Sequence, residues 1–513
     1  MKTTTRSLTL PGAIAGSIQD GDTLAAIDMG SNSFHMIVVR VTLGQLRVVD
    51  RLRETVRLGE GLYGRGKLDP QVRDRALGCL SRFGQRIRKL PARHVRALAT
   101  NAVRQMASPR DFLIPAEEAL GHAIEVIAGR EEARLVYQGV AHVQPPKRGQ
   151  RRLVIDIGGG STECIIGTGL DPLMRESLQV GCISSTRRFF PSGKLTRQKW
   201  QAAFHEVAGQ YQQFASSYRN LGWHETIGSS GTNKAIGAIL AAMGLTKGGV
   251  TAEALPQLRA RMLEASHIDE IDLPGLTDER RPVIAGGVLA LEAAFAVLGI
   301  ERMAISKAAM REGVLYDMLG RGSEHDPREA AIQALTQRYG IDESQAARVH
   351  ATALRLFDQV AGDWELGDDD RLMLGWAARL HEIGLTIAHS QHHVHGTYIL
   401  AHSDIPGFSV QEQRFLAALV RTHRRKVPAD AFDALPERLL RPAKRLSALL
   451  RLAALLHHAG EDEPMPVPRL AARGSVLGLH MDPDWLEAHP LLRADLEGEP
   501  DDMAGLGIEL RLE

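Results

Sequence analysis

The sequence predicts an α/β protein with a duplicated, two-lobed fold, followed by a nearly all-helical domain and a small α+β domain. A strand–turn–strand pattern occurs twice, within residues 26–41 and 154–167. After each copy, strand-like and helix-like segments alternate, and beyond residue 326 the helical period dominates. The length of 513 residues also exceeds what one hydrophobic core normally holds.

The first copy of the pattern follows residues 1–23, which we predict to be a flexible N-terminal tail. Its sequence is Ala26-Ile27-Asp28-Met29-Gly30-Ser31-Asn32-Ser33-Phe34. The second copy is Val154-Ile155-Asp156-Ile157-Gly158-Gly159-Gly160-Ser161-Thr162-Glu163. Each has an apolar run that ends in Asp, a turn of small residues and a second apolar run, which predicts a β-hairpin.

Both predicted turns have the composition of a phosphate-binding loop. Gly and Ser expose backbone N–H groups and hydroxyls with little bulk, so phosphate oxygens can approach and accept hydrogen bonds. The candidate phosphate-binding residues are Gly30, Ser31, Asn32, Ser33, Gly158, Gly159, Gly160, Ser161 and Thr162. The strand-end carboxylates Asp28 and Asp156 add hard oxygen ligands suited to Mg²⁺. Two such hairpins, facing each other, would clamp a phosphate chain and its metal.

Different folds that contain a Gly-rich turn fit this sequence less well. A single turn of this kind is often only structural, and it is the duplication that favours the phosphate clamp. A dinucleotide fold requires a helix directly after the glycines, whereas residues 163–166 continue as a strand. A Walker loop requires a terminal Gly-Lys-Ser/Thr, which neither copy has.

The remaining elements of the two lobes follow from periodicity. For the first lobe, residues 24–135, we predict strands at 24–27, 36–41, 46–49, 95–99 and 124–128 and helices at 69–90 and 109–120. For the second, residues 136–322, we predict helices at 199–220, 234–243, 252–265 and 283–298. A third Gly/Ser turn at 227–233 makes Gly231 a further phosphate-contact candidate. Two units that open with the same hairpin predict a cleft between the lobes.

The C-terminal part changes character. Residues 323–470 have the pattern of a helical domain that ends in a Pro-rich linker at 464–468. Residues 471–513 have the pattern of a small α+β domain with strands at 475–480 and 508–512 and a helix at 483–487.

Composition limits the functions to consider. The 62 basic and 61 acidic residues nearly cancel, so net charge predicts neither nucleic-acid binding nor strong membrane attachment. The three cysteines fit no metal or disulfide spacing, which suits a reducing compartment. No apolar run reaches the ~18 residues that span a membrane, although peripheral association stays open. We therefore expect a cytoplasmic protein.

Two adjacent carboxylates, Glu131 and Glu132, begin a helix after the strand at 124–128. Acidic residues favour helix starts because they complement the helix dipole, which by itself is a sufficient structural reason. The functional alternative is that Glu132 orients and deprotonates an attacking water. Phosphoryl transfer to water requires an in-line nucleophile, a metal and fixed donors on the moving phosphoryl group. The hairpins, Arg104 and Glu132 would supply that set.

A histidine cluster lies in the helical domain. Its members are His381, His389, His392, His393, His395 and His402. Such a density indicates a metal site, and His381-Glu382 resembles the His-Asp pair of HD-type metal phosphohydrolases with Glu in place of Asp. Since no later Asp stands in a closing-ligand context, we expect a degenerate HD fold with a packing or substrate-binding role.

Together these motifs resemble the exopolyphosphatase / guanosine pentaphosphate phosphohydrolase family, and most of all its long bacterial exopolyphosphatases. The resemblance rests on residues 27–36, 129–135, 156–163 and 311–316. It implies an actin-like bilobed α/β fold, as in acetate and sugar kinases, heat-shock chaperones and actin. It also implies an HD-like helical domain, a small C-terminal domain and a homodimer.

The resemblance also implies roles for individual residues. The glutamate matching Glu132 activates water, and the arginine matching Arg104 contacts substrate phosphate. The acidic residues matching Asp156 and Glu163 help to hold Mg²⁺. The family's Thr-Ser-Ala-x-Arg stretch occurs at residues 100–104 with Asn101 in place of Ser.

The activity implied is processive removal of terminal orthophosphate from inorganic polyphosphate. The basic run at 421–426 is most simply a solvated face, but we expect Arg424 and Arg425 in it to bind the polymer. One alternative is hydrolysis of guanosine pentaphosphate, alone or in addition. Another is an actin-like nucleotide-binding module without hydrolysis, against which Glu132 beside two intact hairpins argues.

Overall fold

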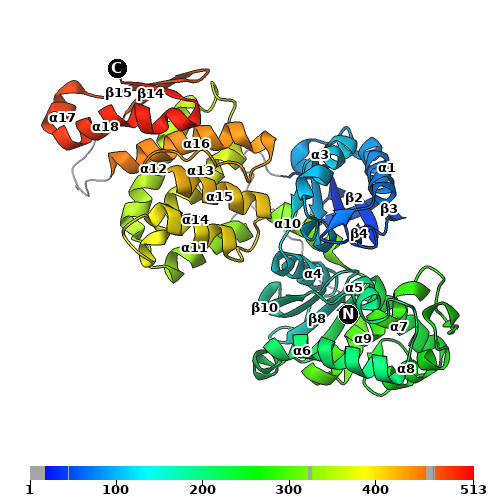
Figure 1. Cartoon of the computed structure of the whole chain (residues 1–513). Helices are drawn as coiled ribbons and strands as arrows, with labels where there is room; N and C mark the ends of the chain where they lie inside the picture. Colours follow the sequence, from blue (N-terminus) through cyan, green and yellow to red (C-terminus); the bar gives the residue numbers. More distant parts are fainter. Residues whose placement is uncertain (1–17, 44, 322–325, 458–465, 467, 513) are drawn as a thin grey trace. The chain divides into compact units, whose positions relative to one another are not determined.

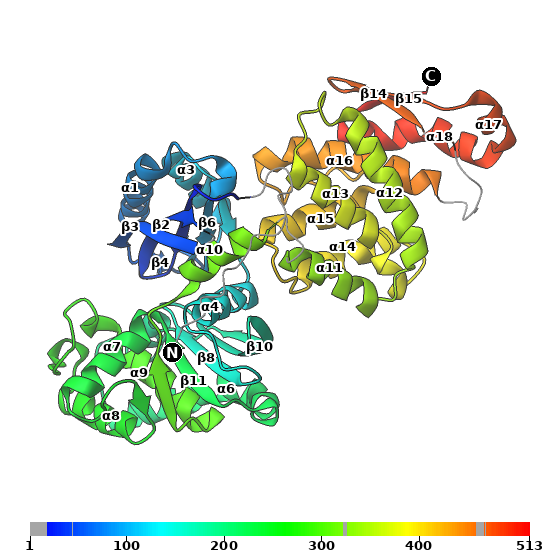
Figure 2. The same cartoon turned by 180° about the vertical axis from the view of Figure 1, so that it is seen from behind.

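The chain forms two compact units, residues 1–324 and 325–513 (Figures 1 and 2). The computed structural model describes residues 18–43, 45–321, 326–457, 466 and 468–512. Most of the predicted N-terminal tail, the predicted boundary at 322/323 and most of the predicted linker at 464–468 therefore lie outside the described residues. The first unit contains both predicted lobes.

Lobe I is built on a five-stranded sheet with the order β3-β2-β1-β6-β7. Its strands are β1 (Thr23–Met29), β2 (Ser33–Thr42), β3 (Gln45–Thr55), β6 (Val95–Ala99) and β7 (Ile124–Val126). The first three are antiparallel, and β6 and β7 continue parallel to β1. Helices α1 (Pro70–Ile87) and α3 (Pro109–Leu120) pack against each other, and a small hairpin, β4 (Leu62–Tyr63) and β5 (Lys67–Leu68), precedes α1.

Lobe II repeats this order in a six-stranded sheet, β10-β9-β8-β11-β13-β12. Its strands are β8 (Arg151–Ile157), β9 (Thr162–Thr168), β10 (Asp171–Leu178), β11 (Glu225–Ser229), β12 (Val250–Thr251) and β13 (Arg302–Ile305). Again three antiparallel strands are followed by two strands, β11 and β13, parallel to the first, and the short β12 ends the sheet antiparallel to β13. Both lobes therefore have the actin-like arrangement that the sequence predicts.

Alternate side chains of β8 pack into two different hydrophobic cores. Leu153 and Ile155 face a core shared with α6 (Arg197–Leu221), α7 (Ser230–Ala242), α8 (Ala254–Glu264) and α9 (Arg281–Leu298). Val154 faces a second core that also contains Leu24 and Ala26 of lobe I. Among the described residues, α9 is the one helix long and apolar enough to cross a membrane, and 78% of it is buried inside the protein.

Two helices fill the core that both sheets share. They are α4 (Gly129–Val143) and α10 (Met310–Gly320), and they pack on each other and on strands of both lobes. The predicted boundary at 135/136 consequently falls inside α4. The apolar face of α4 contacts β9 and β10 although its first residue follows β7 of lobe I.

The second unit has one continuous core. Its helices are α11 (Pro327–Arg338), α12 (Glu343–Val360), α13 (Asp368–Leu380), α14 (His392–His402), α15 (Val410–Thr422) and α16 (Glu437–Leu456). The C-terminal elements are β14 (Arg469–Arg473), β15 (Val476–His480), α17 (Pro483–Ala488), α18 (Pro490–Met503) and β16 (Glu509–Leu512). Leu477 and Leu510 of these strands belong to the same buried cluster as Leu356 of α12. The predicted boundary at 470/471 thus falls inside β14, and the last residues complete the helical core.

The elements that the sequence did not predict include β10, β14 and α18. β10 is the edge strand of its sheet and is mostly half-buried or exposed, so its sequence lacks a buried apolar alternation. α18 contains Gly498 and Pro500, which have the lowest helix propensities.

The contact between α4 and α10 requires glycine. A Cβ on Gly313 of α10 would lie 1.8 Å from the Leu135 carbonyl oxygen of α4. We expect Gly313→Ala to destabilise the first unit by about 2 kcal/mol, because the two helices must separate to admit the methyl group. The control is Gly209→Ala of α6, where no described atom lies within 4 Å of the new Cβ. Here we expect the free energy of unfolding to rise by up to ~1 kcal/mol, because Ala has a higher helix propensity than Gly. Melting temperatures of the two variants test this; equal shifts would contradict it.

Candidate active site

The two repeated turns and the start of α4 line one cavity of about 270 Å³ in the first unit, the cleft. The sequence-predicted residues on its wall are Asp28, Gly30, Ser31, Asn32, Ser33, Glu132, Asp156, Gly158, Gly159, Gly160, Ser161 and Gly231. Segments that lie far apart in the sequence therefore meet as the duplicated pattern predicts.

Each hairpin pairs the Asp near the end of its first strand with a residue near the start of its second strand. Asp28 of β1 pairs across the ladder with His35 of β2, and Asp156 of β8 pairs with Glu163 of β9. The two turns approach closely: a Cβ on Gly159 would lie 3.0 Å from the Ser31 Cβ. Glycine in the second turn thus lets the backbones of both lobes converge on one point.

The third Gly/Ser turn contributes from the start of α7. Ser230 has a φ of 83°, a left-handed conformation that is unfavourable for a residue other than glycine. A Cβ on the next residue, Gly231, would lie 2.1 Å from Nη2 of Arg280. The turn therefore brings backbone and a guanidinium group together at the wall of the cleft.

Glu132 and Arg104 form an ion pair beside the turns. Arg104 Nη1 donates to Glu132 Oε2 at 3.1 Å and to the Ile127 carbonyl oxygen at 2.6 Å. The second terminal nitrogen of Arg104, Nη2, is buried and has no hydrogen-bond partner among the described residues. Arg104 thus fixes Glu132 with one nitrogen and keeps another for an incoming acceptor.

Burial is the main influence on the Glu132 carboxyl. It raises the pKa above the ordinary value, and the Arg104 charge and hydrogen bond oppose that rise. A general base works best when its pKa lies near the working pH, so a carboxylate with a raised pKa suits proton abstraction from water.

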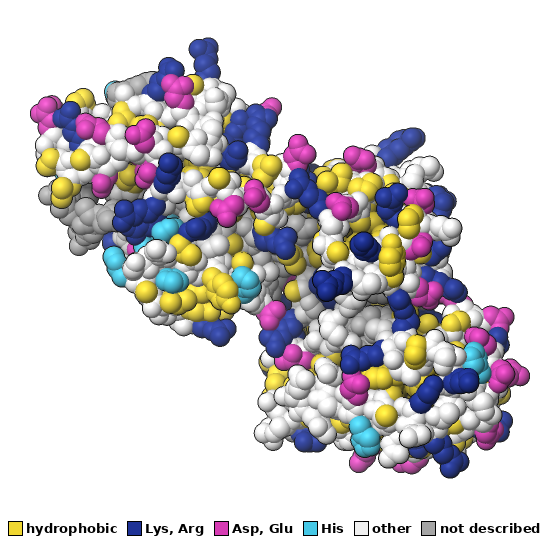
Figure 3. Space-filling model, in the orientation of Figure 1, with side chains coloured by type: hydrophobic (Ala, Val, Ile, Leu, Met, Phe, Trp, Pro, Cys, Tyr) yellow, Lys and Arg dark blue, Asp and Glu magenta, His cyan; other side chains and the backbone are white. Residues whose placement is uncertain are grey.

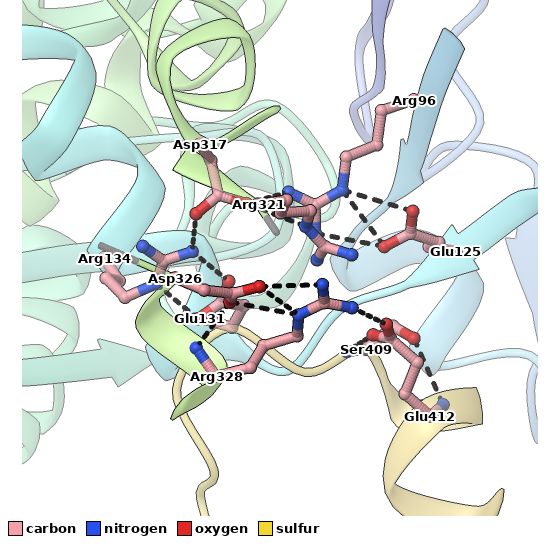
Figure 4. Close-up of polar contacts among 10 residues, drawn as sticks. All are labelled: Arg96, Glu125, Glu131, Arg134, Asp317, Arg321, Asp326, Arg328, Ser409 and Glu412. Atoms are coloured by element: carbon pink, nitrogen blue, oxygen red, sulfur yellow. Dashed lines mark hydrogen bonds and ion pairs between the residues drawn. The ribbon is translucent and has the colours of Figure 1, made fainter. Parts of the chain in front are cut away.

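The neighbouring Glu131 has a different environment (Figure 4). Its carboxylate accepts two hydrogen bonds from Arg134, at 2.7 and 2.8 Å, inside the protein. Arg134 also binds Asp317 of α10 at 2.5 Å, and Asp317 is fully buried and pairs with Arg96 of β6. This network ties the first turn of α4 to α10 and to the lobe I sheet. It fixes the helix position from which Glu132 reaches the cleft.

The remaining acidic groups of the site are also buried. Burial raises the pKa of Asp28 to about 7 and that of Asp156 to about 6, and the Glu132 charge adds to both shifts. Burial together with the charges of Glu132 and Asp156 raises the pKa of Glu163 well above its ordinary value. Several carboxyl groups therefore share a small volume, where a divalent cation would offset their mutual repulsion.

Three predicted residues of this unit, Arg104, Thr162 and Glu163, are not among those that line the cleft. Glu163 is 1% exposed and accepts a hydrogen bond from Ser177 Oγ at 2.9 Å. The Thr162 hydroxyl donates to the Val180 carbonyl oxygen inside lobe II. As the first residue of β9, Thr162 points its side chain into the lobe.

Sequence reasoning missed a group of basic side chains and one histidine on the cleft wall. They are His35, Arg53, Lys234, Arg280 and Arg311. Burial and the nearby Arg311 lower the pKa of His35 to about 3, so its imidazole is neutral. Lys234 and Arg311 stand next to recognised motifs, which is a usable signal. Arg53 lies on the edge strand β3 and Arg280 at the start of α9, and no sequence motif marks either residue.

The histidine cluster of the second unit does not assemble a metal site. Within the described ranges, no group of three or more His, Cys, Asp or Glu residues is arranged to hold a metal ion. His381 and His423 are buried with ring centroids 5.4 Å apart. This agrees with a packing role for these two. Figure 3 shows histidine side chains gathered on the visible face of this unit.

The expected polymer-binding arginines belong to the same unit. Arg424 is half-buried and its Nη1 lies 3.3 Å from Nδ1 of His392. Arg425 follows with a φ of 63°.

The first helix of the unit is fixed by Arg328, whose guanidinium binds Asp326 at 2.9 Å and Glu412 at 3.3 Å (Figure 4).

Two family models match most of the chain. The Ppx/GppA phosphatase family model matches residues 37–322, and the model of Ppx/GppA phosphatase domain III matches residues 328–500. Among curated proteins, "Guanosine-5'-triphosphate,3'-diphosphate pyrophosphatase" of Pseudoalteromonas translucida is 36% identical, over 95% of this chain and 97% of its own. The protein of the same name from Vibrio vulnificus is also 36% identical, over 95% and 98%.

Solved structures show the same fold for the first unit. An exopolyphosphatase from Cytophaga hutchinsonii superposes with a TM-score of 0.53 at 23% identity, over 59% of this chain and 99% of that one. An exopolyphosphatase-like protein superposes with a TM-score of 0.52 at 25% identity, over 58% and 98%.

Burial of an acidic group has a consequence for stability. Asp28 titrates near pH 7 when folded and near 4 when unfolded, so folding loses stability as pH rises from about 4 to about 7. The amide of Asp28→Asn never ionises, so the variant should not lose stability in this way. We expect its stability relative to the parent to be greater at pH 8 than at pH 5 by about 2 kcal/mol. Melting temperatures in metal-free buffer at both pH values measure the gain.

The matched control is Asp74→Asn on α1, whose side chain is 69% exposed. Its melting temperature should follow that of the parent at both pH values. A pH-independent difference for Asp28→Asn would show that Asp28 ionises freely in the folded protein.

Proposed function

The chain belongs to the Ppx/GppA phosphatase family and is a phosphoanhydride hydrolase, and we propose that its substrate is guanosine pentaphosphate. In this reaction the terminal phosphate of the 5′-triphosphate is released as orthophosphate. The observation that carries the proposal is the name shared by curated relatives that match along 95% of the chain. This reverses the order of substrates expected from the sequence, where polyphosphate came first.

The geometry supports water attack with Glu132 as the base. A terminal phosphoryl group between the two turns would receive hydrogen bonds from backbone N–H groups and from hydroxyls such as Ser31 and Ser161. Glu132 takes the proton of the attacking water, and the new P–O bond forms as the bridging P–O bond breaks. The leaving diphosphate end keeps the bonding electron pair.

Arg104 supports both partners of the reaction. Its ion pair orients the Glu132 carboxylate, and its buried Nη2, which has no partner within the described part of the chain, is a donor for a phosphoryl oxygen. A guanidinium next to the base would stabilise the charge that develops in the transition state.

Mg²⁺ fits the acidic residues of the site. We propose that Asp28 and Asp156 hold it from opposite lobes and that Glu163 supports Asp156 from behind. Mg²⁺ usually binds through one or two carboxylates together with waters and substrate phosphates, as this donor set allows. When bound, the ion would neutralise phosphate charge and polarise the bond to be broken.

The rest of a highly charged substrate has partners in the same cleft. Arg53, Lys234 and Arg280 reach its wall from both lobes. One phosphoryl group at the turns does not need so many cations, whereas a substrate with five phosphates does.

Polyphosphate remains a second candidate for a specific reason. The described residues that line the cleft include no Phe, Tyr or Trp, so among them only the imidazole of His35 offers a ring to stack on a nucleobase. An exopolyphosphatase-like protein is also among the structural neighbours at 25% identity. A site that contacts only phosphate groups would accept either polyphosphate or guanosine pentaphosphate.

The direct test is orthophosphate release by the purified protein with the two substrates side by side. We expect a higher kcat/KM for guanosine pentaphosphate than for long-chain polyphosphate. The reverse ranking would restore polyphosphate as the main substrate. Release from neither would reject both proposals.

We expect Glu132→Gln to lower kcat by at least ~10²-fold with little change in KM, because the amide keeps the shape but cannot accept a proton. Steady-state kinetics with guanosine pentaphosphate measure this. The matched control is Glu118→Gln on the exposed face of α3, which should behave like the parent. Parental turnover of a folded Glu132→Gln protein would remove the base assignment.

The raised pKa values predict that Mg²⁺ activation depends on pH. Asp28 and Asp156 titrate near 7 and 6, and each must lose its proton to bind a cation. The Mg²⁺ concentration for half-maximal activity should therefore fall as pH rises from about 5.5 to about 8. Isothermal titration of Mg²⁺ into the substrate-free protein at both pH values gives the same information without turnover. Affinity that does not change with pH would exclude these carboxylates as ligands.

A further inference from the structure

A second cavity of about 540 Å³ adjoins the cleft, and we call it the exit cavity. Four residues, Ser31, Asn101, Gly159 and Gly160, line both cavities. They belong to the two phosphate-binding turns and to the short segment after β6. The turns are therefore a shared wall, with the cleft on one side and the exit cavity on the other.

The exit cavity differs from the cleft in the charged residues of its wall. Among the described residues, its lining contains Arg187 and Arg188 and no Asp or Glu, and Arg188 is paired with Glu206 outside the lining. The cleft wall contains the acids Asp28, Glu132 and Asp156 together with four basic residues, Arg53, Lys234, Arg280 and Arg311. Arg187 donates to the carbonyl oxygens of Gly59 at 2.7 Å and Leu62 at 2.9 Å, which carry no formal charge. Its guanidinium therefore holds the loop after β3 in place and still contributes a positive potential.

Orthophosphate needs such a route. Under the function proposed above, on which this step rests, hydrolysis leaves orthophosphate at the turns while the rest of the substrate still occupies the basic part of the cleft. An anion beside Arg187, Ser184 and glycine backbone is attracted. The exit cavity offers a path that does not require the larger product to leave first.

We propose that the exit cavity is a release site for orthophosphate and that a cluster of side-chain amides gates it. Asn101 Nδ2 donates to Gln179 Oε1 at 2.8 Å, and Gln105 Nε2 donates to the same oxygen at 2.9 Å. Asn101 and Gln105 belong to lobe I, whereas Gln179 follows β10 of lobe II. The cluster thus joins the two lobes at the edge of the exit cavity.

The gate is coupled to the phosphate-binding turn. Asn101 is buried, and a Cβ on Gly160 would lie 2.3 Å from its Oδ1. A shift of the Gly160 turn toward Asn101 would therefore push on this side chain and on its hydrogen bond to Gln179. Asn101 stands where the resembling family has Ser.

The test blocks the exit cavity from its rim. Gln105 is exposed and lines the exit cavity but not the cleft, so Gln105→Trp places an indole in the opening. Gln105→Ala removes the same amide and leaves the space open. Gln201→Trp, on the exposed face of α6, is the control for a surface tryptophan.

Each protein is mixed with guanosine pentaphosphate under single-turnover conditions. Acid quenching follows cleavage, and a fluorescent phosphate-binding sensor follows the appearance of free orthophosphate. In Gln105→Trp we expect cleavage at the parental rate and a phosphate signal at least threefold slower. In Gln105→Ala, which removes one hydrogen bond of the gate and leaves the opening free, we expect a shorter delay between cleavage and the phosphate signal than in the parent. In Gln201→Trp the two signals should keep the parental relation.

The outcomes separate the two proposals. Absence of cleavage in the parent would reject the substrate assignment, whatever the sensor reports. Parental cleavage with no delay in Gln105→Trp would reject the release site. Slower cleavage in folded Gln105→Trp would show that the exit cavity holds substrate, and an equal delay in Gln105→Ala would show that obstruction is not the cause; either result overturns the proposal.

Discussion

The close approach of α4 and α10 is the constraint on which the rest of the site depends. Gly139 and Gly313 let the two backbones touch, with the ideal Cβ of Gly313 only 1.8 Å from a carbonyl oxygen of α4. The fully buried Asp317 then joins α10 to Arg134 of α4 and Arg96 of lobe I. Because Glu132 stands at one end of α4 and Arg311 at the start of α10, this contact sets the distance between base and basic wall. The rigid helix pair lets both lobes share one site.

The acidic groups of the site are electrostatically unfavourable in the free protein, and binding of a cation with the substrate would reduce that unfavourable energy. Asp28, Asp156, Glu132 and Glu163 are buried together, and burial is the largest cause of each raised pKa. Such a group is unfavourable in the free protein, which is typical of functional rather than structural clusters. Arg104 offsets part of the cost at Glu132.

The fold and the acidic half of the site were readable from the sequence, because hairpins and strand ends are local features. An apolar run ending in Asp before a Gly/Ser turn specifies both the strand and the direction of its carboxylate. Arg53 and Arg280 were not readable, because they reach the cleft through sheet order and helix packing rather than through a motif. Thr162 shows that membership of a motif does not fix a side chain's direction, since its hydroxyl donates to a carbonyl oxygen inside the lobe. The edge strand β10 was missed because exposure removes the apolar alternation on which prediction relies.

The two copies of the hairpin have diverged in a way that assigns them different tasks. At equivalent ladder positions, lobe I has Asp28 opposite His35 and lobe II has Asp156 opposite Glu163. Burial and the charges of nearby arginines, Arg311 foremost, lower the pKa of His35 and keep its ring neutral. Glu163 instead places a second carboxyl behind Asp156, and its pKa is raised well above the ordinary value. The two hairpins thus put different groups next to their aspartates, a neutral imidazole in lobe I and a carboxyl in lobe II. A fully symmetrical duplication would lack this difference, and divergence at one position of the repeat is sufficient to create it.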